Sequence, residues 1–151
     1  MPKQLINYRI EKVVTPADLD SVEAVVKRYY EDVGVVVLDS RSDLEHYDIW
    51  LARSDGEPVG CIFLRDLPQI PGSGEVKRMY VDPAYRGQGI GQGLLDALEQ
   101  HARSLGLSWL YLDTREDLKT ALSRYVNNGY VYCDRYNNNQ EVTIFMRKQL
   151  R

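Results

Sequence analysis

A glycine-rich segment between a strand pattern and a helix pattern is the feature that most constrains this chain. The expected strand Glu75–Val81 stops at Asp82-Pro83, and four glycines follow within Gly87–Gly93. Glycine allows tight backbone turns and leaves consecutive N–H groups exposed. The first turn of the next helix adds N–H groups without an internal acceptor and the positive end of the helix dipole. The segment therefore predicts a strand–turn–helix unit with an anion site for a phosphate or pyrophosphate.

The spacing of these glycines excludes two common nucleotide-binding loops. A Walker loop needs Lys followed by Ser or Thr after its glycines, and that pair is missing here. The dinucleotide pattern G-x-G-x-x-G also fails, because its last position is Gln92 when counted from Gly87 and Leu94 when counted from Gly89. A turn that only links strand to helix is the alternative. Glycines weaken helix initiation, so their density favours a ligand that approaches the backbone closely.

Hydrophobic periodicity and turn signals around this segment predict alternating strands and helices. A helix is expected between the cap Thr15 and the stop Gly34, and Asp55-Gly56 marks a hairpin turn. The middle of the chain implies parallel strands joined by helices, and the hairpins imply antiparallel partners. The remaining expected elements are strand Leu5–Val14, helix Ser40–His46, strands Asp48–Arg53 and Pro58–Arg65, helix Gly89–Leu105, strand Leu107–Leu112, a helix capped by Thr114–Asp117, and strands Tyr130–Cys133 and Val142–Arg147.

Length and composition restrict the class of protein further. The 151 residues suit a single domain, residues 1–151, with one core. A net charge of −3 gives no global attraction to nucleic acid or anionic lipid. We find neither a signal peptide nor an apolar run of the roughly 20 residues that a membrane helix needs. Cys61 and Cys133 lack metal-ligand spacing. We therefore expect a cytoplasmic protein with no metal, nucleic-acid or membrane partner.

The glycine segment, with its pattern Arg86-x-x-Gly89-x-Gly91, resembles the pyrophosphate-binding motif of the GNAT superfamily of N-acetyltransferases. Ala121–Tyr130 is similar to the pattern A-x-x-L-Y-x-x-x-G-F of that superfamily, with Arg for Leu and Tyr for Phe. The resemblance extends from about Val59 to Leu150. A departure is Leu118, where the superfamily often has an Asn that touches the cofactor.

Two further segments are similar to small bacterial members of the superfamily. Tyr111–Thr114 resembles the strand that parts from the motif strand. Tyr136–Asn139 and Phe145-Met146 resemble a Y-x-x-N-P … F-M ending, in which Asn139 replaces the proline.

This resemblance implies an α/β fold with a mixed, mostly antiparallel sheet of about six or seven strands. About four helices would flank the sheet, and its fourth and fifth strands would splay apart. It also implies acetyl-coenzyme A as cosubstrate, with the pyrophosphate on the glycine turn and the pantetheine beside the motif strand. The implied cofactor-binding residues are Met79, Tyr80, Val81, Arg86, Gly87, Gln88, Gly89, Ile90, Gly91 and Tyr125.

Acetyl transfer to an amine needs an oxyanion donor, a base and an acid, and the resemblance suggests a candidate for each. The N–H of Met79 would face the thioester oxygen, and Tyr125 would protonate the departing thiolate. Glu75 is the candidate base, acting through a water, although an exposed strand-end carboxylate paired with Lys77 is the alternative. Asp113 is a second candidate base, for which helix capping is the simpler interpretation. Tyr125 also fits a purely structural place on an apolar helix face.

The acceptor carries no motif in this sequence. The acidic balance and the pair Tyr29-Tyr30 favour a small cationic amine over a protein N-terminus or lysine. A non-catalytic acetyl-coenzyme A sensor of the same fold is the rival to an enzyme. We also expect a homodimer through the last strand, Val142–Met146, because terminal strands are often sheet edges.

Overall fold

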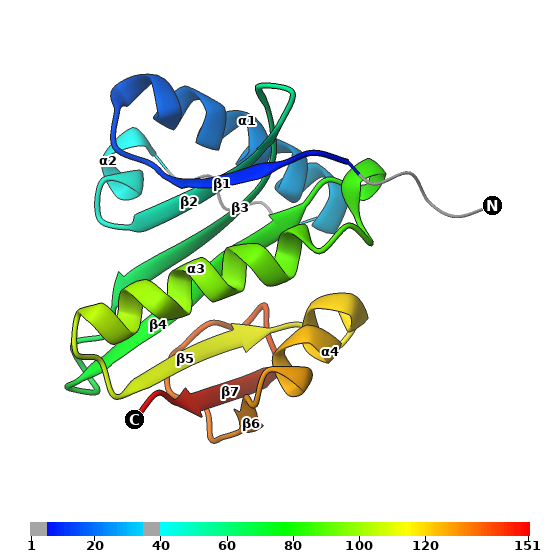
Figure 1. Cartoon of the computed structure of the whole chain (residues 1–151). Helices are drawn as coiled ribbons and strands as arrows, with labels where there is room; N and C mark the ends of the chain where they lie inside the picture. The colour runs from blue at the N-terminus through cyan, green and yellow to red at the C-terminus, as the bar shows by residue number, and fades with distance from the viewer. Residues whose placement is uncertain (1–5, 35–39) are drawn as a thin grey trace. The chain divides into compact units, whose positions relative to one another are not determined.

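The computed structural model describes residues 6–34 and 40–151. Its elements follow the expected order, and Leu5 of the first expected strand lies outside the described residues. In sequence they are β1 (Arg9–Lys12), α1 (Pro16–Val33), α2 (Arg41–Leu44), β2 (Asp48–Ser54), β3 (Glu57–Asp66), β4 (Ser73–Val81), the 3-10 turn Pro83–Tyr85, α3 (Ile90–Ser104), β5 (Trp109–Thr114), α4 (Lys119–Asn127), β6 (Val131–Tyr132) and β7 (Ile144–Gln149) (Figure 1).

The strands form a seven-stranded mixed sheet in the order β1-β2-β3-β4-β5-β7-β6. Pairs β1–β2, β5–β7 and β6–β7 are antiparallel, and β4–β5 is parallel. The β4–β5 register joins Ser73–Val76 to Trp109–Leu112, so this ladder ends before either strand does. The expected mixed α/β sheet with helices is confirmed. The chain divides into two compact units, Met1–Phe63 with Arg78–Leu98 and Leu64–Lys77 with Glu99–Arg151.

The first unit is built on an amphipathic α1. The Thr15 side chain accepts a hydrogen bond from the Asp18 N–H, and Gly34 ends the helix with a φ of 79°, as the sequence predicts. The buried face of α1 packs against residues from α2 and from the strands of the same unit. This core contains Val22, Val25, Val26, Tyr30, Leu44, Ile49, Leu51, Cys61, Phe63 and Tyr80.

The turn between β2 and β3 confirms the hairpin prediction. Asp55 and Gly56 have φ values of 51° and 80°. Positive φ at both central residues is what a type I′ turn requires, and this turn matches the twist of the flanking strands.

The second unit corrects two expectations. Thr114–Asp117 does not cap α4, because Thr114 still belongs to β5 and the cap position is Leu118, which makes no side-chain capping bond. The last strand is not a sheet edge, because β7 pairs with β5 on one side and β6 on the other. The reason given for a homodimer was therefore wrong, and the homodimer itself stays a prediction.

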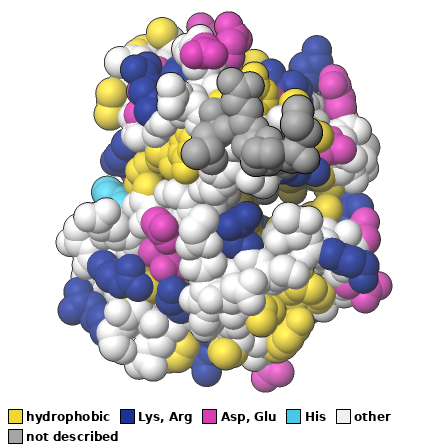
Figure 2. Space-filling view, turned by 45° about the vertical axis from the view of Figure 1, so that its right-hand side comes forward, with side chains coloured by type: hydrophobic (Ala, Val, Ile, Leu, Met, Phe, Trp, Pro, Cys, Tyr) yellow, Lys and Arg dark blue, Asp and Glu magenta, His cyan; other side chains and the backbone are white. Residues whose placement is uncertain are grey.

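The helices and the surface add two observations. None of the helices within the described residues combines the length and apolar character needed to span a lipid bilayer. Basic and acidic side chains are interspersed over the face of the molecule in Figure 2. Opposite charges in this arrangement screen one another at long range.

Candidate active site

The glycine turn in the first unit has the backbone geometry of an anion site. Gly87 and Gly89 have φ values of 79° and 86°, in the left-handed region that favours glycine. The Gly93 N–H donates to the Gly89 carbonyl at 3.0 Å, as in the first turn of an α-helix. The N–H groups that precede Gly93 in α3 therefore lack an acceptor within the helix. Together with the helix dipole, they favour a negatively charged ligand.

The last glycine of the segment, Gly93, packs against another element, a role that the spacing of the glycines does not indicate. A Cβ at Gly93 would lie 2.5 Å from Cδ1 of Ile10 in β1, so the Ile10 side chain would have to shift to admit a larger residue there. Gly89 is different, because a Cβ there would meet only the Tyr8 hydroxyl, at 3.4 Å. Among the described side chains, Gln88 Oε1 is a buried acceptor without a hydrogen-bond partner.

Arg86, an implied cofactor ligand, is tied to the end of α1 within the first unit. Its Nη2 lies 3.0 Å from Asp32 Oδ2, and its Nε donates to the Val81 carbonyl at 2.9 Å. The Tyr80 hydroxyl donates to the same Asp32 oxygen at 3.2 Å. Burial, followed by the negative charge of Asp32, raises the pKa of Tyr80 to about 12. Asp32 therefore holds two of the predicted cofactor-site side chains, and no sequence motif indicated it.

Strand β4 carries an irregular residue directly before the proposed oxyanion donor. Arg78 has a φ of 54°, which is uncommon for a residue with a Cβ. The buried Cys61 thiol donates to the Arg78 carbonyl at 3.3 Å. In a trans peptide the C=O and the next N–H point in opposite directions. The Met79 N–H is therefore directed away from Cys61.

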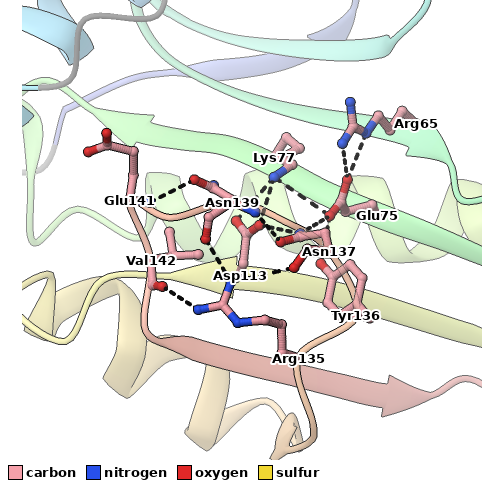
Figure 3. A network of polar contacts seen from close by, with 10 residues as sticks. All are labelled: Arg65, Glu75, Lys77, Asp113, Arg135, Tyr136, Asn137, Asn139, Glu141 and Val142. Carbon is pink, nitrogen blue, oxygen red and sulfur yellow. Dashed lines mark hydrogen bonds and ion pairs between the residues drawn. The ribbon is translucent and has the colours of Figure 1, made fainter.

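Glu75 lies within β4 in the second unit, and its side chain is 0% exposed (Figure 3). Its Oε1 accepts from Arg65 Nε at 2.7 Å and lies 2.6 Å from Arg65 Nη2. Its Oε2 accepts from the Tyr136 hydroxyl at 2.6 Å. The alternative of an exposed strand-end carboxylate is wrong, although Lys77 does lie nearby, with Nζ 3.6 Å from Oε2. The carboxylate is held by donors from two other segments of the same unit.

Asp113 belongs to the same cluster and does not cap a helix. Lys77 Nζ donates to both of its carboxylate oxygens, at 3.1 and 3.0 Å. Asn137 Nδ2 donates to Asp113 Oδ2 at 2.7 Å and reaches Glu75 Oε2 at 3.5 Å. The capping interpretation is therefore wrong. Two carboxylates, Lys77 and Arg65 form a charge-balanced group, which is how buried charges are accommodated.

The loop between β6 and β7 supplies Tyr136 and Asn137, the neutral members of this cluster, and hydrogen bonds within the loop hold it in place. Arg135 donates to the Asn139 carbonyl at 2.8 Å and to the Val142 carbonyl at 3.2 Å (Figure 3). The Asn139 N–H donates to Asn137 Oδ1 at 3.0 Å, and the Glu141 N–H donates to Asn139 Oδ1 at 3.0 Å. The sequence signal was the Asn run, whose side chains readily bond nearby backbone. This signal predicted a loop, but it did not predict that the loop contacts Glu75 and Asp113.

Tyr125 lies on the buried face of α4 in the second unit. The centre of its ring is 5.6 Å from the centre of the Tyr130 ring, in an edge-to-face arrangement. The Tyr130 N–H donates to the Tyr125 carbonyl at 3.0 Å. The Tyr130 hydroxyl donates to Glu99 Oε2 at 2.9 Å, and Lys148 Nζ donates to Glu99 Oε1 at 2.7 Å. The sequence did not indicate Tyr130 and Glu99 as site residues. Periodicity predicts only whether a residue is buried or exposed, and it does not report a contact between positions 31 apart.

The predicted site residues thus fall into groups that are each defined within one unit. Tyr80 and Arg86 gather around Asp32 in the first unit. In the second unit, Glu75 lies in the polar cluster drawn in Figure 3. Tyr125, in the same unit, contacts Tyr130. Within residues 6–34 and 40–151, no three His, Cys, Asp or Glu side chains are grouped so as to hold a metal ion.

Comparison with known proteins gives the class to which this geometry belongs. Residues 18–130 match the model of the acetyltransferase (GNAT) family, which is more than half of the chain. The chain therefore belongs to the GNAT family of acetyltransferases, and it is an acyltransferase of the N-acetyltransferase type.

Individual relatives agree with that assignment. The uncharacterised N-acetyltransferase YjgM of Escherichia coli is 34% identical over 148 residues, covering 88% of this chain and 86% of its own. A GNAT-family acetyltransferase from Staphylococcus aureus has the same fold, with a TM-score of 0.80 at 21% identity over 96% of this chain and 100% of its own. The PaiA N-acetyltransferase of Thermoplasma acidophilum, solved in complex with coenzyme A, has a TM-score of 0.72 at 21% identity over 93% of this chain and 99% of its own.

Proposed function

We propose that this chain transfers the acetyl group of acetyl-coenzyme A to the primary amine of a small molecule, by direct attack of the amine on the thioester. The observation that carries the proposal is the glycine turn at the start of α3, where two left-handed glycines precede N–H groups without helical acceptors. The coenzyme A bound to the Thermoplasma relative supports the same cosubstrate here. The two free cysteines, Cys61 and Cys133, favour the reducing cytoplasm as the place of the reaction.

Holding the cosubstrate is assigned to backbone groups. The N–H groups of Gly87–Gly91 would bind the pyrophosphate, and the pantetheine would run beside Met79–Val81. The Met79 N–H would donate to the thioester oxygen as negative charge develops on it. A preorganised donor of this kind lowers a barrier by roughly 2.7–4 kcal/mol. The Cys61–Arg78 hydrogen bond supports this role, because it fixes the peptide plane that carries the Met79 N–H.

Glu75 is the proposed base. An amine with a pKa near 10 is only about 0.1% neutral at pH 7, so removal of a proton assists attack. Since the Glu75 side chain is fully buried, we expect the proton to arrive through a group already bound to it. The substrate N–H would give its proton to the Tyr136 oxygen while the Tyr136 O–H proton passes to Glu75 Oε2 across their 2.6 Å hydrogen bond. The net result is a neutral amine and a protonated Glu75.

Tyr125 is the proposed acid. When the tetrahedral intermediate collapses, the carbon–sulfur bond breaks and the sulfur leaves as a thiolate. A phenol donates a proton to that sulfur without being ionised beforehand, and the phenolate left behind regains a proton from the nitrogen that became positively charged on attack. The buried position of the Tyr125 side chain on α4 supports a role away from bulk water.

The structure removes one of the two sequence arguments for a small cationic amine as acceptor, the Tyr29-Tyr30 pair. Tyr30 is buried in the core of the first unit, and Tyr29 packs against the same core, with its ring centre 5.4 Å from that of Tyr80. Both rings serve packing, so they do not support an amine pocket. The negative net charge remains in favour of a small cationic amine.

An acceptor screen tests this proposal. Purified protein is incubated with acetyl-coenzyme A and either small primary amines or peptides with free N-termini or lysines, and release of the coenzyme A thiol is followed. We expect release that depends on a small amine. Release only with peptides would favour the protein N-terminal or lysine acetyltransferase. Tight acetyl-coenzyme A binding without release for any amine would favour the sensor.

A further inference from the structure

We propose that Tyr130 is a positioning residue for Tyr125. Its hydroxyl, anchored on the buried carboxylate of Glu99, would hold its ring against the ring of the acid. This inference rests on the proposed function of Tyr125 as proton donor. All of its contacts lie within the second unit.

Tyr130 touches Tyr125 through both backbone and side chain. The Tyr130 N–H donates to the Tyr125 carbonyl at 3.0 Å, which ties the end of α4 to the start of the following segment. The two rings meet edge to face, with centres 5.6 Å apart and an angle of 62° between their planes. The energy of such a pair depends on the angle and offset of the rings, so one ring restrains the other.

The far end of the Tyr130 ring is also fixed. Its hydroxyl donates to Glu99 Oε2 at 2.9 Å, and only 2% of Tyr130 is exposed. Lys148 Nζ donates to the other Glu99 oxygen at 2.7 Å and lies 5.7 Å from the centre of the Tyr130 ring. Burial, followed by the charge of Glu99, raises the pKa of the Tyr130 phenol well above its usual range. The phenol therefore stays protonated at neutral pH and can donate its hydrogen bond to Glu99.

Packing alone does not require the Tyr130 hydroxyl or its hydrogen bond to Glu99. A phenylalanine would fill the same space, and it is the residue of the A-x-x-L-Y-x-x-x-G-F pattern that this segment resembles. The tyrosine here brings a buried Glu99 and its partner Lys148, and burying such charges is costly unless they are paired. A ring held at its backbone and at its hydroxyl tilts less than a ring held only by packing. Proton transfer depends steeply on donor placement, so the restraint would act on the chemical step.

A double-mutant cycle tests the proposal. Wild type, Tyr130→Phe, Tyr125→Phe and the double variant are compared by kcat and by KM for acetyl-coenzyme A, at a temperature well below every melting midpoint. We expect Tyr130→Phe to lower kcat about tenfold with little change in KM. We expect the same substitution to have no further effect in the Tyr125→Phe background, because its target is then absent. Tyr132→Phe, at an exposed position of β6, is the matched control and should leave kcat unchanged.

Each outcome of the cycle has one meaning. A wild-type kcat for Tyr130→Phe, or an equal fall in both backgrounds, would overturn the positioning role while leaving Tyr125 as the acid. A wild-type kcat for Tyr125→Phe would instead remove the acid on which the inference rests. Glu99→Gln gives a second variant, since Gln keeps an oxygen that accepts from Tyr130. We expect its kcat to lie between those of wild type and Tyr130→Phe, and a loss larger than that of Tyr130→Phe would contradict the proposal.

Discussion

At the scale of single residues, Gly89 offers the sharpest test of the cofactor turn. Its φ of 86°, and the absence of any side chain of its own, suit a backbone that a ligand approaches closely. Gly89→Val should remove hydrogen bonds to a charged pyrophosphate, and weaken acetyl-coenzyme A binding about 10- to 100-fold in calorimetry.

The matched control for this substitution is Gly56→Val. Gly56 has a φ of 80°, and a Cβ there meets nothing within 4 Å, so the backbone strain is similar but lies in the β2–β3 hairpin. We expect this control to lose stability and keep its affinity. Equal affinities for Gly89→Val and wild type would show that the pyrophosphate binds elsewhere.

Glu75→Gln tests the base at the same scale. The substitution keeps the shape of the side chain and removes its capacity to take up a proton, so turnover near neutral pH should fall about 10²–10⁴-fold. Tyr136→Phe should lower turnover as well, because it breaks the proposed relay. Glu141→Gln, an exposed glutamate of the same loop, is the control and should be active. Full turnover by Glu75→Gln would show that Glu75 is not the base and that its carboxylate serves only to bind Arg65 and Tyr136.

Several residues of the site could not be predicted from the sequence, for physical reasons. The glycine turn was predictable, because left-handed backbone has a residue signature. The left-handed Arg78 has none, and its carbonyl accepts from Cys61, a contact between distant positions that local sequence does not report. The contacts that Tyr136 and Asn137 make with Glu75 join segments about 60 positions apart, and spacing alone does not report such pairs.

At the scale of elements, periodicity predicted the helices and strands well and their ends less well. Helix α3 buries Ile90, Leu94, Leu98 and Ala102 as its stripe predicts, whereas Leu105 lies past its end and is exposed. The start of α4 was misplaced, because a capping box resembles any short polar stretch. There the Arg115 guanidinium pairs with Asp117, 2.6 Å from its Oδ2, and the strand continues to Thr114.

The uncapped start of α4 leads to a prediction about stability. Leu118 occupies the cap position and makes no side-chain capping bond, although capping residues normally satisfy a free N–H there. Leu118→Asn should stabilise the protein by about 1 kcal/mol and raise its melting temperature. Lys119→Asn places the same amide one residue inside the helix and should not stabilise it. A lower melting temperature for Leu118→Asn than for wild type would mean that the partly buried Leu118 contributes more by packing than a cap does.

At the scale of the whole molecule, Tyr80 links global stability to alkaline pH. Its folded-state pKa of about 12 exceeds the ordinary 10.0, so the folded protein holds this proton more tightly than the unfolded chain. The contribution to stability is complete below pH 10 and is lost as pH rises toward 12. Urea unfolding at several alkaline pH values should show this loss, and Tyr80→Phe should reduce it. An unchanged pH dependence in Tyr80→Phe would assign the loss to other groups, such as Tyr130 and Tyr136, whose pKa values are also raised.

The central claim for the whole molecule is that it turns over acetyl-coenzyme A with Tyr125 as the acid. The most direct test is steady-state release of the coenzyme A thiol by wild type and Tyr125→Phe, with an amine from the acceptor screen. The substitution keeps the buried ring, so melting temperature and acetyl-coenzyme A affinity should change little. Turnover should fall by about 10²–10⁴-fold. Equal turnover at matched stability would contradict the account, and it would leave solvent as the source of the proton.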